Sequence, residues 1–482
     1  MVFPVVGGNE SKGYEVENSV RFHNPSQDKL SITPSSASNR KTMTFSCWAK
    51  RSTTGGSAGA YNSLFSAKSS GNEAINIAFG NGAFSAGGDY FEVTHGSSAG
   101  GGNYDWSYRS NGFYRDFSAW YHVVAAIDTT QSSANDRIKL YVNGVEIDKT
   151  VTNSVALNAD TEFNNTQLHM VGAFARDDNS HFDGYLAETH FVDGSALLPT
   201  SFGKFDNNGV WIPIKYTGSH GTNGFFLEFQ QTGTSQNSSG IGADTSGNDN
   251  HFAVANLTSI DITEDTCTNN FATCNGLSGK GTDDLTNGNL VLDADSSGDI
   301  IAPSTIGFSS GKWYMEMKST ITAGHGNRKT VGVYETDSDI NHPRQFTSSS
   351  PYNGIVVDLR NGSAYNSAVD GNATDTSSFA NNDICGLAYD ADNGLLYVYK
   401  NGTAENSGNS LNAGNPLDTS KTYAFYIAQD GGGTNNGELF CNFGNPSFSI
   451  SSGNNDGEYG NFEYAPPSGY YALCTKRLAE FG

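Results

Sequence analysis

The sequence predicts an all-β protein built from two antiparallel β-sandwiches in tandem. Its 482 residues exceed what one ordinary hydrophobic core holds. Glycine is frequent, with 57 residues, and aromatic residues make up 12% of the chain. This composition is typical of short strands joined by tight turns. No window carries apolar residues at the spacing of an amphipathic helix, so long helices are not expected.

The predicted elements fall into four segments along the chain. Residues 1–14 mix apolar residues with glycine, which predicts an N-terminal arm that orders on assembly. Residues 15–229 carry the first set of strands. Residues 230–285 are rich in Ser, Thr, Asn and Gly, which predicts a connector with no core of its own. Residues 286–482 resume the strand pattern and form the second sandwich.

The clearest strands of the first sandwich are residues 42–50, 120–127 and 137–142, each bounded by turn-forming residues. The last of these leads into Tyr141-Val-Asn-Gly144, and the second sandwich repeats the pattern at Tyr399-Lys-Asn-Gly402. An Asn-Gly pair after an aliphatic strand is typical of a type I′ hairpin. The repetition favours two domains of the same architecture.

The formal net charge is −23, with no stripe of Lys and Arg. This charge argues against binding to nucleic acid or to an anionic membrane and favours neutral or cationic partners. No apolar run approaches the roughly 20 residues that span a bilayer. The first residues also lack the basic and apolar segments of a signal peptide. We therefore expect a protein that leaves its cell by lysis or stays inside it.

The six cysteines are scattered and do not have the spacing of a zinc site. We expect most of them to be reduced and buried. Cys267 and Cys274 are the pair that a local disulfide would join, and the sequence leaves open whether they form it.

Three motifs of the first sandwich carry a family resemblance. They are Phe45-Ser-Cys-Trp-Ala-Lys-Arg51, Trp120-Tyr-His-Val-Val124 and Ile138-Lys-Leu-Tyr-Val-Asn-Gly-Val-Glu146. Together they resemble laminin-G-like modules of the concanavalin type over about residues 20–200. The resemblance implies a jelly-roll sandwich and says little about the ligand.

The second sandwich resembles a SPRY domain over about residues 286–475. The motifs are Ser310-Gly-Lys-Trp-Tyr-Met-Glu316, Asp383-Ile-Cys-Gly-Leu-Ala-Tyr-Asp390, Leu395-Leu-Tyr-Val-Tyr-Lys-Asn-Gly402 and Phe440-Cys-Asn-Phe-Gly444. The resemblance implies a second concanavalin-like sandwich whose loops contact protein or peptide partners.

The combination of modules resembles structural proteins of tailed bacteriophages. The motifs are the segment from Phe182 to Gly194, Gly209-Val-Trp-Ile-Pro213, the segment from Gly242 to Phe252, and the ending that begins at Pro466. The resemblance implies a virion protein of a tail fibre, baseplate or capsid fibre, made in the host cytoplasm and released by lysis. Such a protein would be a homo-oligomer that binds host-surface glycan or protein, or neighbouring virion proteins.

No catalytic motif stands out, and we do not expect an enzyme. Glycan-cleaving jelly rolls carry a Glu-x-Asp-x-x-Glu strand, whose alternation points the carboxylates into one cleft, and this spacing is absent. A nucleophile elbow and a phosphate-binding loop are also absent. His122 lies in an apolar strand, where a buried structural histidine is expected. The alternative is a glycan-processing enzyme with appended binding modules, and it would need a carboxylate pair in a cleft.

Two sets of residues in the first sandwich are candidate ligand contacts. Tyr104, Trp106 and Tyr108 alternate along one strand and would form either a sugar-stacking platform or part of the core. Tyr114 and Arg115, in the loop before Trp120, are candidates for surface contacts.

In the second sandwich, the SPRY resemblance implies partner loops at residues 342–352 and 429–436. Arg344 and Tyr352 are the candidate contacts there.

Calcium is the one cofactor that the sequence suggests. Asp293, Asp295 and Asp299 imitate the start of a calcium loop, but Ser304 occupies the place of its closing glutamate. Asp177 and Asp178 are further candidate ligands in the first sandwich. A solvated acidic turn is the alternative at both places.

Overall fold

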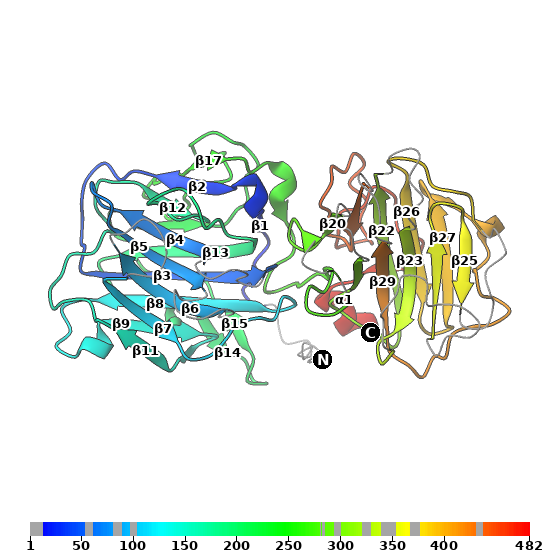
Figure 1. The fold of residues 1–482 in the computed structure, drawn as a ribbon, viewed down its shortest axis with the longest axis horizontal. Coiled ribbons are helices and arrows are strands. Elements are labelled where there is room, and N and C mark those ends of the chain that lie inside the picture. Colours follow the sequence, from blue (N-terminus) through cyan, green and yellow to red (C-terminus); the bar gives the residue numbers. More distant parts are fainter. Residues whose placement is uncertain are drawn as a thin grey trace. The chain divides into compact units, whose positions relative to one another are not determined.

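The computed structural model confirms the all-β prediction (Figure 1). It describes residues 13–53, 61–80, 89–96, 104–279, 281, 285–293, 300–320, 329–338, 353–366, 376–429 and 437–482. The predicted N-terminal arm lies almost wholly outside these residues. The chain divides into two compact units, and the division falls between Thr268 and Asn269.

The first unit is a sandwich of two sheets. The first sheet has the order β10-β9-β8-β3-β13-β1-β18, with β16 paired to β13, and the second has the order β11-β7-β6-β5-β4-β12-β2-β17. The strands of the first sheet are β10 (Val145–Glu146), β9 (Ile138–Val142), β8 (Trp120–Asp128), β3 (Thr42–Arg51), β13 (Gly184–Asp193), β1 (Ser19–Phe22), β18 (Ile262–Thr263) and β16 (Phe225–Leu227). Those of the second are β11 (Lys149–Thr152), β7 (Trp106–Ser110), β6 (Tyr90–Gly96), β5 (Ala74–Gly80), β4 (Tyr61–Lys68), β12 (His169–Val171), β2 (Lys29–Ile32) and β17 (Ala253–Ala255).

The two sheets of the first unit share one aromatic-rich core. Phe45 of β3 stacks on Phe65 of β4, with ring centroids 5.4 Å apart, and so joins the sheets directly. β14 (Gly203–Phe205) and β15 (Trp211–Pro213) follow β13 in the sequence and pair with each other as a short hairpin. Among the described strands they form a separate two-stranded sheet.

The second unit is also a sandwich. Its larger sheet has the order β19-β20-β30-β22-β26-β27-β28, with β31 paired in parallel to β22, and its smaller sheet has the order β21-β29-β23-β24-β25. The strands of the larger sheet are β19 (Leu285–Thr286), β20 (Val291–Asp293), β30 (Glu438–Asn442), β22 (Lys312–Ser319), β26 (Ile384–Asp390), β27 (Leu395–Lys400), β28 (Thr403–Ala404) and β31 (Tyr471–Ala472). Those of the smaller sheet are β21 (Ile300–Pro303), β29 (Tyr423–Gln429), β23 (Lys329–Glu335), β24 (Gly354–Asp358) and β25 (Ser363–Asn366).

Helix is scarce in the described part of the chain. The α-helix α1 covers Thr475–Phe481, near the C-terminus. Short 3₁₀ turns cover Asn24–Ser26, Ala134–Asp136, Pro199–Ser201, Ser259–Asp261 and Asn406–Gly408. None of the helices in the described ranges has the length and apolar character needed to cross a membrane.

Both predicted Asn-Gly hairpins form. Asn143 and Gly144 join β9 to β10, and Asn401 and Gly402 join β27 to β28, all four with positive φ. The positive φ values at both central positions are those of a type I′ turn.

The predicted connector, residues 230–285, does not stay outside the cores. Ile241, Phe252 and Leu257 are buried in the core of the first unit, and β17 and β18 join its sheets. Cys274 is buried in the second unit. The few apolar side chains of this Ser- and Gly-rich stretch anchor it in the cores of the two units, so the stretch does not run only along their surfaces.

The cysteines confirm the expectation that most of them are reduced and buried. All six cysteines are free thiols, and Cys267 is not bonded to Cys274. Instead, the sulfur of Cys274 lies 3.5 Å from that of Cys441 on β30, inside the core of the second unit. The reason is that Cys267 belongs to the first unit and Cys274 to the second, since the division falls between Thr268 and Asn269.

Candidate ligand-binding site

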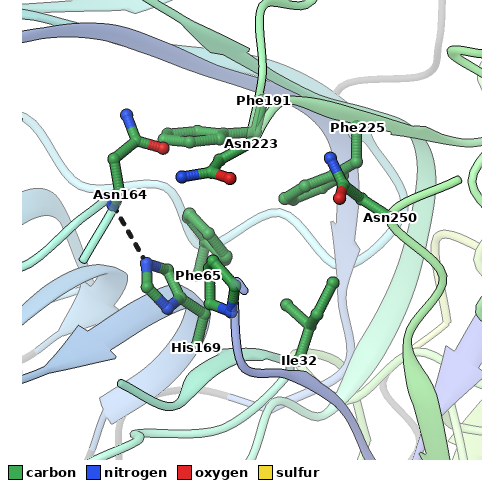
Figure 2. Close-up of a pocket in the computed structure, with 9 residues that line it drawn as sticks. Ile32, Phe65, Asn164, His169, Phe191, Asn223, Phe225 and Asn250 are labelled. Carbon is green, nitrogen blue, oxygen red and sulfur yellow. Dashed lines mark hydrogen bonds between the residues drawn. The ribbon is translucent and has the colours of Figure 1, made fainter. Parts of the chain in front are cut away.

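A small hollow opens at the edge of the first sandwich, between its two sheets (Figure 2). Its floor consists of three buried aromatic rings, those of Phe65 on β4, Phe191 on β13 and Phe225 on β16. Its volume of about 10 Å³ fits one group of the size of a water molecule. The remaining lining residues are Ile32, Pro34, Asn164, His169, Asn223 and Asn250.

Asn164 is completely buried at one wall of the hollow. Its Nδ2 donates to the carbonyl of Asn39 and to Oδ1 of Asp193, at 2.9 Å in the second case. Both amide hydrogens are therefore committed, which fixes the orientation of the side chain. Its Oδ1 is buried and accepts no hydrogen bond from the described residues.

Asn223 and Asn250 also line the hollow, and Figure 2 shows Asn223 beside Asn164 and Asn250 beside Phe225. Asn223 Nδ2 donates to the carbonyl of Ser36 and to Oγ of Ser38, at 2.9 and 2.8 Å. Asn250 Nδ2 donates to the carbonyls of Thr222 and Gly224, at 3.0 and 2.9 Å. Each side-chain NH₂ group thus donates to the protein, and each side-chain oxygen remains available to accept a hydrogen bond from a ligand.

Two buried carboxylates hold the loops that carry these amides. Asp193, at the end of β13, accepts from Asn164 on one oxygen and from the backbone N–H groups of Thr222 and Asn223 on the other, both at 3.1 Å. Asp244 accepts from the backbone N–H groups of Phe226 and Asn250, both at 2.9 Å. The acceptors around the hollow are therefore pre-organised before any ligand arrives.

The imidazole of His169 completes the wall as a neutral group. Burial lowers its pKa to about 4. Its Nδ1 lies 2.8 Å from the carbonyl of Gln167 and donates to it, because a carbonyl can only accept. Its Nε2 then accepts from the backbone N–H of Asn164 at 3.1 Å. With both nitrogens occupied, His169 cannot act as an acid or base near neutral pH.

The hollow therefore offers hydrogen-bond acceptors above an apolar floor. None of its lining residues, all within the described ranges, is an aspartate or glutamate. The arrangement suits a neutral group that donates hydrogen bonds and brings C–H surface with it, as a saccharide hydroxyl does.

The aromatic residues predicted as a sugar platform lie elsewhere. Tyr108 is fully buried and Trp106 is 8% exposed, and both belong to the core of the first unit. The OH of Tyr108 donates to the carbonyl of Ala134 at 2.7 Å. Tyr104 precedes β7 and is partly buried. Trp106 and Tyr108 face inward, so the core interpretation holds for them and the platform interpretation does not.

Tyr114 and Arg115 contact the protein itself. Tyr114 packs against the core, with its ring centroid 5.5 Å from that of Tyr121. Arg115 pairs with Asp89 at 2.7 Å and lies over the ring of Phe113. Its side chain is 45% exposed, so it stays available to a ligand at the surface. Neither residue lines the hollow.

Arg344 and Tyr352, and both predicted partner loops apart from Gln429, lie outside the described residues.

Some of the predicted calcium ligands lie within the described residues and others lie outside them. Asp177 contacts Arg176 at 3.3 Å, and Asp178 contacts Lys29 at 2.7 Å, so each carboxylate already has a cationic partner. The backbone of Asp293 ends β20, whereas Asp295 and Asp299 lie outside the described residues.

Another group has the composition of a metal site and was missed by the sequence analysis. Glu73, His95 and Glu162 bring ligand atoms within 4.8 Å of one another. Burial lowers the pKa of His95, but the contact with Glu162 and the charges of Asp105 and Glu73 outweigh it, and the pKa is raised overall. The three residues are far apart in the sequence, so no spacing rule could have singled them out.

A serine–histidine contact in the first sheet does not form a catalytic pair. Ser46 Oγ lies 2.9 Å from Nε2 of His122, while Trp211 Nε1 donates to Nδ1 of His122 at 3.0 Å. Because Nδ1 accepts, the proton sits on Nε2 and is donated to the serine. His122 therefore cannot take the proton of Ser46, and its role is the structural one expected from the sequence.

Comparisons with known proteins agree with the fold of the first unit. One family model matches residues 24–200 and is described as the concanavalin A-like lectin/glucanases superfamily. The chain therefore contains a concanavalin-like domain, as its strand motifs predicted. No curated protein matches the chain.

Two solved structures are among those similar to parts of the chain. The SPRY domain of human HERC1 is 16% identical, with 32% of this chain and 87% of that chain covered and a TM-score of 0.24. A native heptameric SAP-like pentraxin from Limulus polyphemus is 14% identical, with 38% and 78% covered and a TM-score of 0.27.

Proposed function

We propose that this chain is a non-enzymatic binding protein whose first unit binds a neutral glycan at the hollow. The observation that carries the proposal is the set of three amide oxygens, those of Asn164, Asn223 and Asn250. Their nitrogens are committed to the protein, so a ligand meets acceptors alone. A saccharide hydroxyl supplies the matching donor, and the rings below contact its carbon atoms.

The size and charge of the site support a neutral partner. The hollow admits one hydroxyl group, so the rest of the glycan would lie over Pro34 and the rim. The net charge of −23 disfavours acidic glycans. The lack of carboxylates in the lining supports binding over glycan cleavage, which needs a carboxylate pair.

The setting that we propose is the virion of a tailed bacteriophage. The support is the sequence resemblance, including the segment from Gly242 to Phe252, which supplies Asn250 to the hollow. On a fibre, baseplate or capsid, the chain would be a homo-oligomeric structural protein that attaches to host-surface glycan. Contact with neighbouring virion proteins would use other surfaces.

The test is binding of the purified chain, in its native oligomeric state, to candidate host cells and to an array of their surface glycans. Binding is measured with Ca²⁺ and with chelator. We expect saturable binding to neutral glycans that weakens about 3- to 10-fold in Asn223→Ala and in Asn250→Ala, the effect of one lost hydrogen bond. Loss of binding in chelator would show that calcium takes part.

Asn208→Ala is the matched control, because Asn208 is an exposed asparagine of the same unit that does not line the hollow. Tryptophan fluorescence checks that each variant is folded. Binding that is unaffected by Asn223→Ala and Asn250→Ala would show that the hollow holds only water. If the folded wild type binds nothing under either condition, the attachment role is wrong and a purely structural role remains.

A further inference from the structure

A cluster in the first unit, separate from the lining of the hollow, has the composition of a transition-metal site. Glu73 directly precedes β5, His95 lies on β6, and Glu162 lies in the segment before β12. One carboxylate oxygen from each glutamate and one imidazole nitrogen lie within 4.8 Å of one another.

The closest pair has the separation expected of two ligands on one ion. Nε2 of His95 lies 3.2 Å from Oε2 of Glu162. Zinc binds imidazole nitrogen and carboxylate oxygen at about 2.0–2.2 Å each, so tetrahedral ligands lie about 3.3–3.5 Å apart. The two atoms are thus close to the positions that a shared ion requires.

Glu162 gives a second, independent reason to expect a cation. The residue is only 5% exposed. The close contact of Oε2 is that with Nε2 of His95, at 3.2 Å and without the geometry of a hydrogen bond. A neutral imidazole does not balance the charge of this buried carboxylate, whereas a metal ion bound by both groups does.

The histidine ring is held from its other side. Nδ1 of His95 lies 3.2 Å from Oδ2 of Asp105 without the geometry of a hydrogen bond, so a carboxylate stands on the side of the ring away from the cluster. The ring also stacks on Trp106, with centroids 5.2 Å apart and an angle of 8° between the planes. These two contacts leave Nε2 directed at the cluster.

We propose that Glu73, His95 and Glu162 bind one first-row divalent cation such as Zn²⁺. An imidazole with two carboxylates suits zinc or manganese, whereas calcium takes oxygen ligands. Glu73 is exposed, so the ion can enter from solvent, and three protein ligands leave a coordination position open. The site is independent of the glycan proposal, because none of the three residues lines the hollow.

The test is metal binding by the full chain after treatment with chelator. Calorimetric titration with Zn²⁺ should show one equivalent bound per chain at this site. Co²⁺ should give a visible absorption spectrum that excess Zn²⁺ abolishes. Loss of an outer partner already weakens metal sites about 10- to 100-fold. We therefore expect Glu162→Gln and His95→Gln to weaken binding at least about 100-fold.

Glu17→Gln is the matched control, since it makes the same change at an exposed glutamate of the same unit outside the cluster and should leave the affinity unchanged. Glu73→Gln changes an exposed residue and keeps the test valid if the buried variants do not fold. Equal binding by the wild type and by the folded Glu73→Gln, Glu162→Gln and His95→Gln variants would mean that surface carboxylates hold the ion. That result, or no binding by the wild type, would overturn the proposal.

Discussion

At the scale of single residues, the first unit buries histidines in their neutral form. His122 is 1% exposed, and both of its nitrogens are used, one accepting from Trp211 and one donating to Ser46. Burial, followed by the nearby His190, lowers the pKa of His122 to about 3. The ring therefore stays neutral across the pH range in which a free histidine becomes charged.

This burial makes the stability of the first unit depend on pH. Below about pH 6.5 the unfolded chain protonates His122, whereas the native state does not until about pH 3. The unfolded state thus binds more protons than the native state in this range. The free energy of unfolding therefore decreases as the pH is lowered. Relative to His122→Gln, which cannot be protonated, the wild type should lose about 2 kcal/mol between pH 7.5 and pH 5.

Urea unfolding at the two pH values, followed by tryptophan fluorescence, measures this difference. Four of the five tryptophans (Trp48, Trp106, Trp120 and Trp211) lie in the first unit, so the signal reports mainly on it. Other titrating groups contribute to both proteins and largely cancel. Equal pH dependence in the two proteins would contradict a neutral, buried His122.

At the scale of elements, the two Asn-Gly hairpins use the same device. Asn143 Oδ1 accepts from the backbone N–H of His122 at 2.8 Å, and Asn401 Oδ1 accepts from that of Ile384 at 2.9 Å. In both units the side-chain oxygen of the turn asparagine thus connects the hairpin to the neighbouring strand of the sheet, β8 in the first unit and β26 in the second. The asparagine is needed for this hydrogen bond as well as for its tolerance of positive φ.

The glycine of the first hairpin has a second requirement. At Gly144, φ is +81°, and a Cβ would lie 2.3 Å from the ring of Trp211. Gly209 has a similar φ of +79° but open space around it. Gly209→Ala should therefore cost about 1 kcal/mol for the backbone alone. Gly144→Ala should cost at least about 1 kcal/mol more, because Trp211 must move.

Thermal or urea unfolding of the two variants provides the comparison. Equal losses of stability would show that Trp211 does not pack on the turn. Gly112, with open space and no positive φ, gives a third variant that should be nearly neutral on substitution by alanine.

Elements of this kind were predictable because their signal is local. The Asn-Gly turns and the strands at β3, β8 and β9 follow from short stretches of sequence and form as predicted. The orientation of β7 was harder to predict. Alternation shows that Trp106 and Tyr108 share a face, but only the position of the other sheet decides that this face is the core.

At the scale of the whole molecule, the sites depend on contacts that no local pattern contains. Asn164, Asn223 and Asn250 meet at the hollow because β12, β16 and the loop after Asp244 converge there. In a chain with many loop asparagines, nothing in the sequence marks these three. Asp193 and Asp244 hold the segments that carry these asparagines in place. Their hydrogen bonds join residues far apart in the sequence and are seen only in the folded structure.

The two units also have separate cores, since the buried clusters of each are made of its own residues. Destabilising one core should therefore leave the other in place. In the second unit, Arg477 of α1 donates to both oxygens of Asp456, at 2.8 and 3.0 Å, and the carboxylate is completely buried. Asp456→Asn removes the buried charge that faces Arg477 and leaves Glu480, at 2.6 Å, as its remaining close carboxylate, which should cost the second unit about 2 kcal/mol.

Glu458→Gln is the matched control, because Glu458 contacts the same Arg477 at 3.5 Å from an exposed position and should cost less than about 1 kcal/mol. Hydrogen exchange at β22 and β26 reports on the second unit, and tryptophan fluorescence reports mainly on the first, which holds four of the five tryptophans. We expect Asp456→Asn to speed exchange in β22 and β26 without shifting the fluorescence transition. A parallel shift of both signals would show that the two units unfold as one, because only coupled units transmit the loss of one buried ion pair to a core that does not contain it.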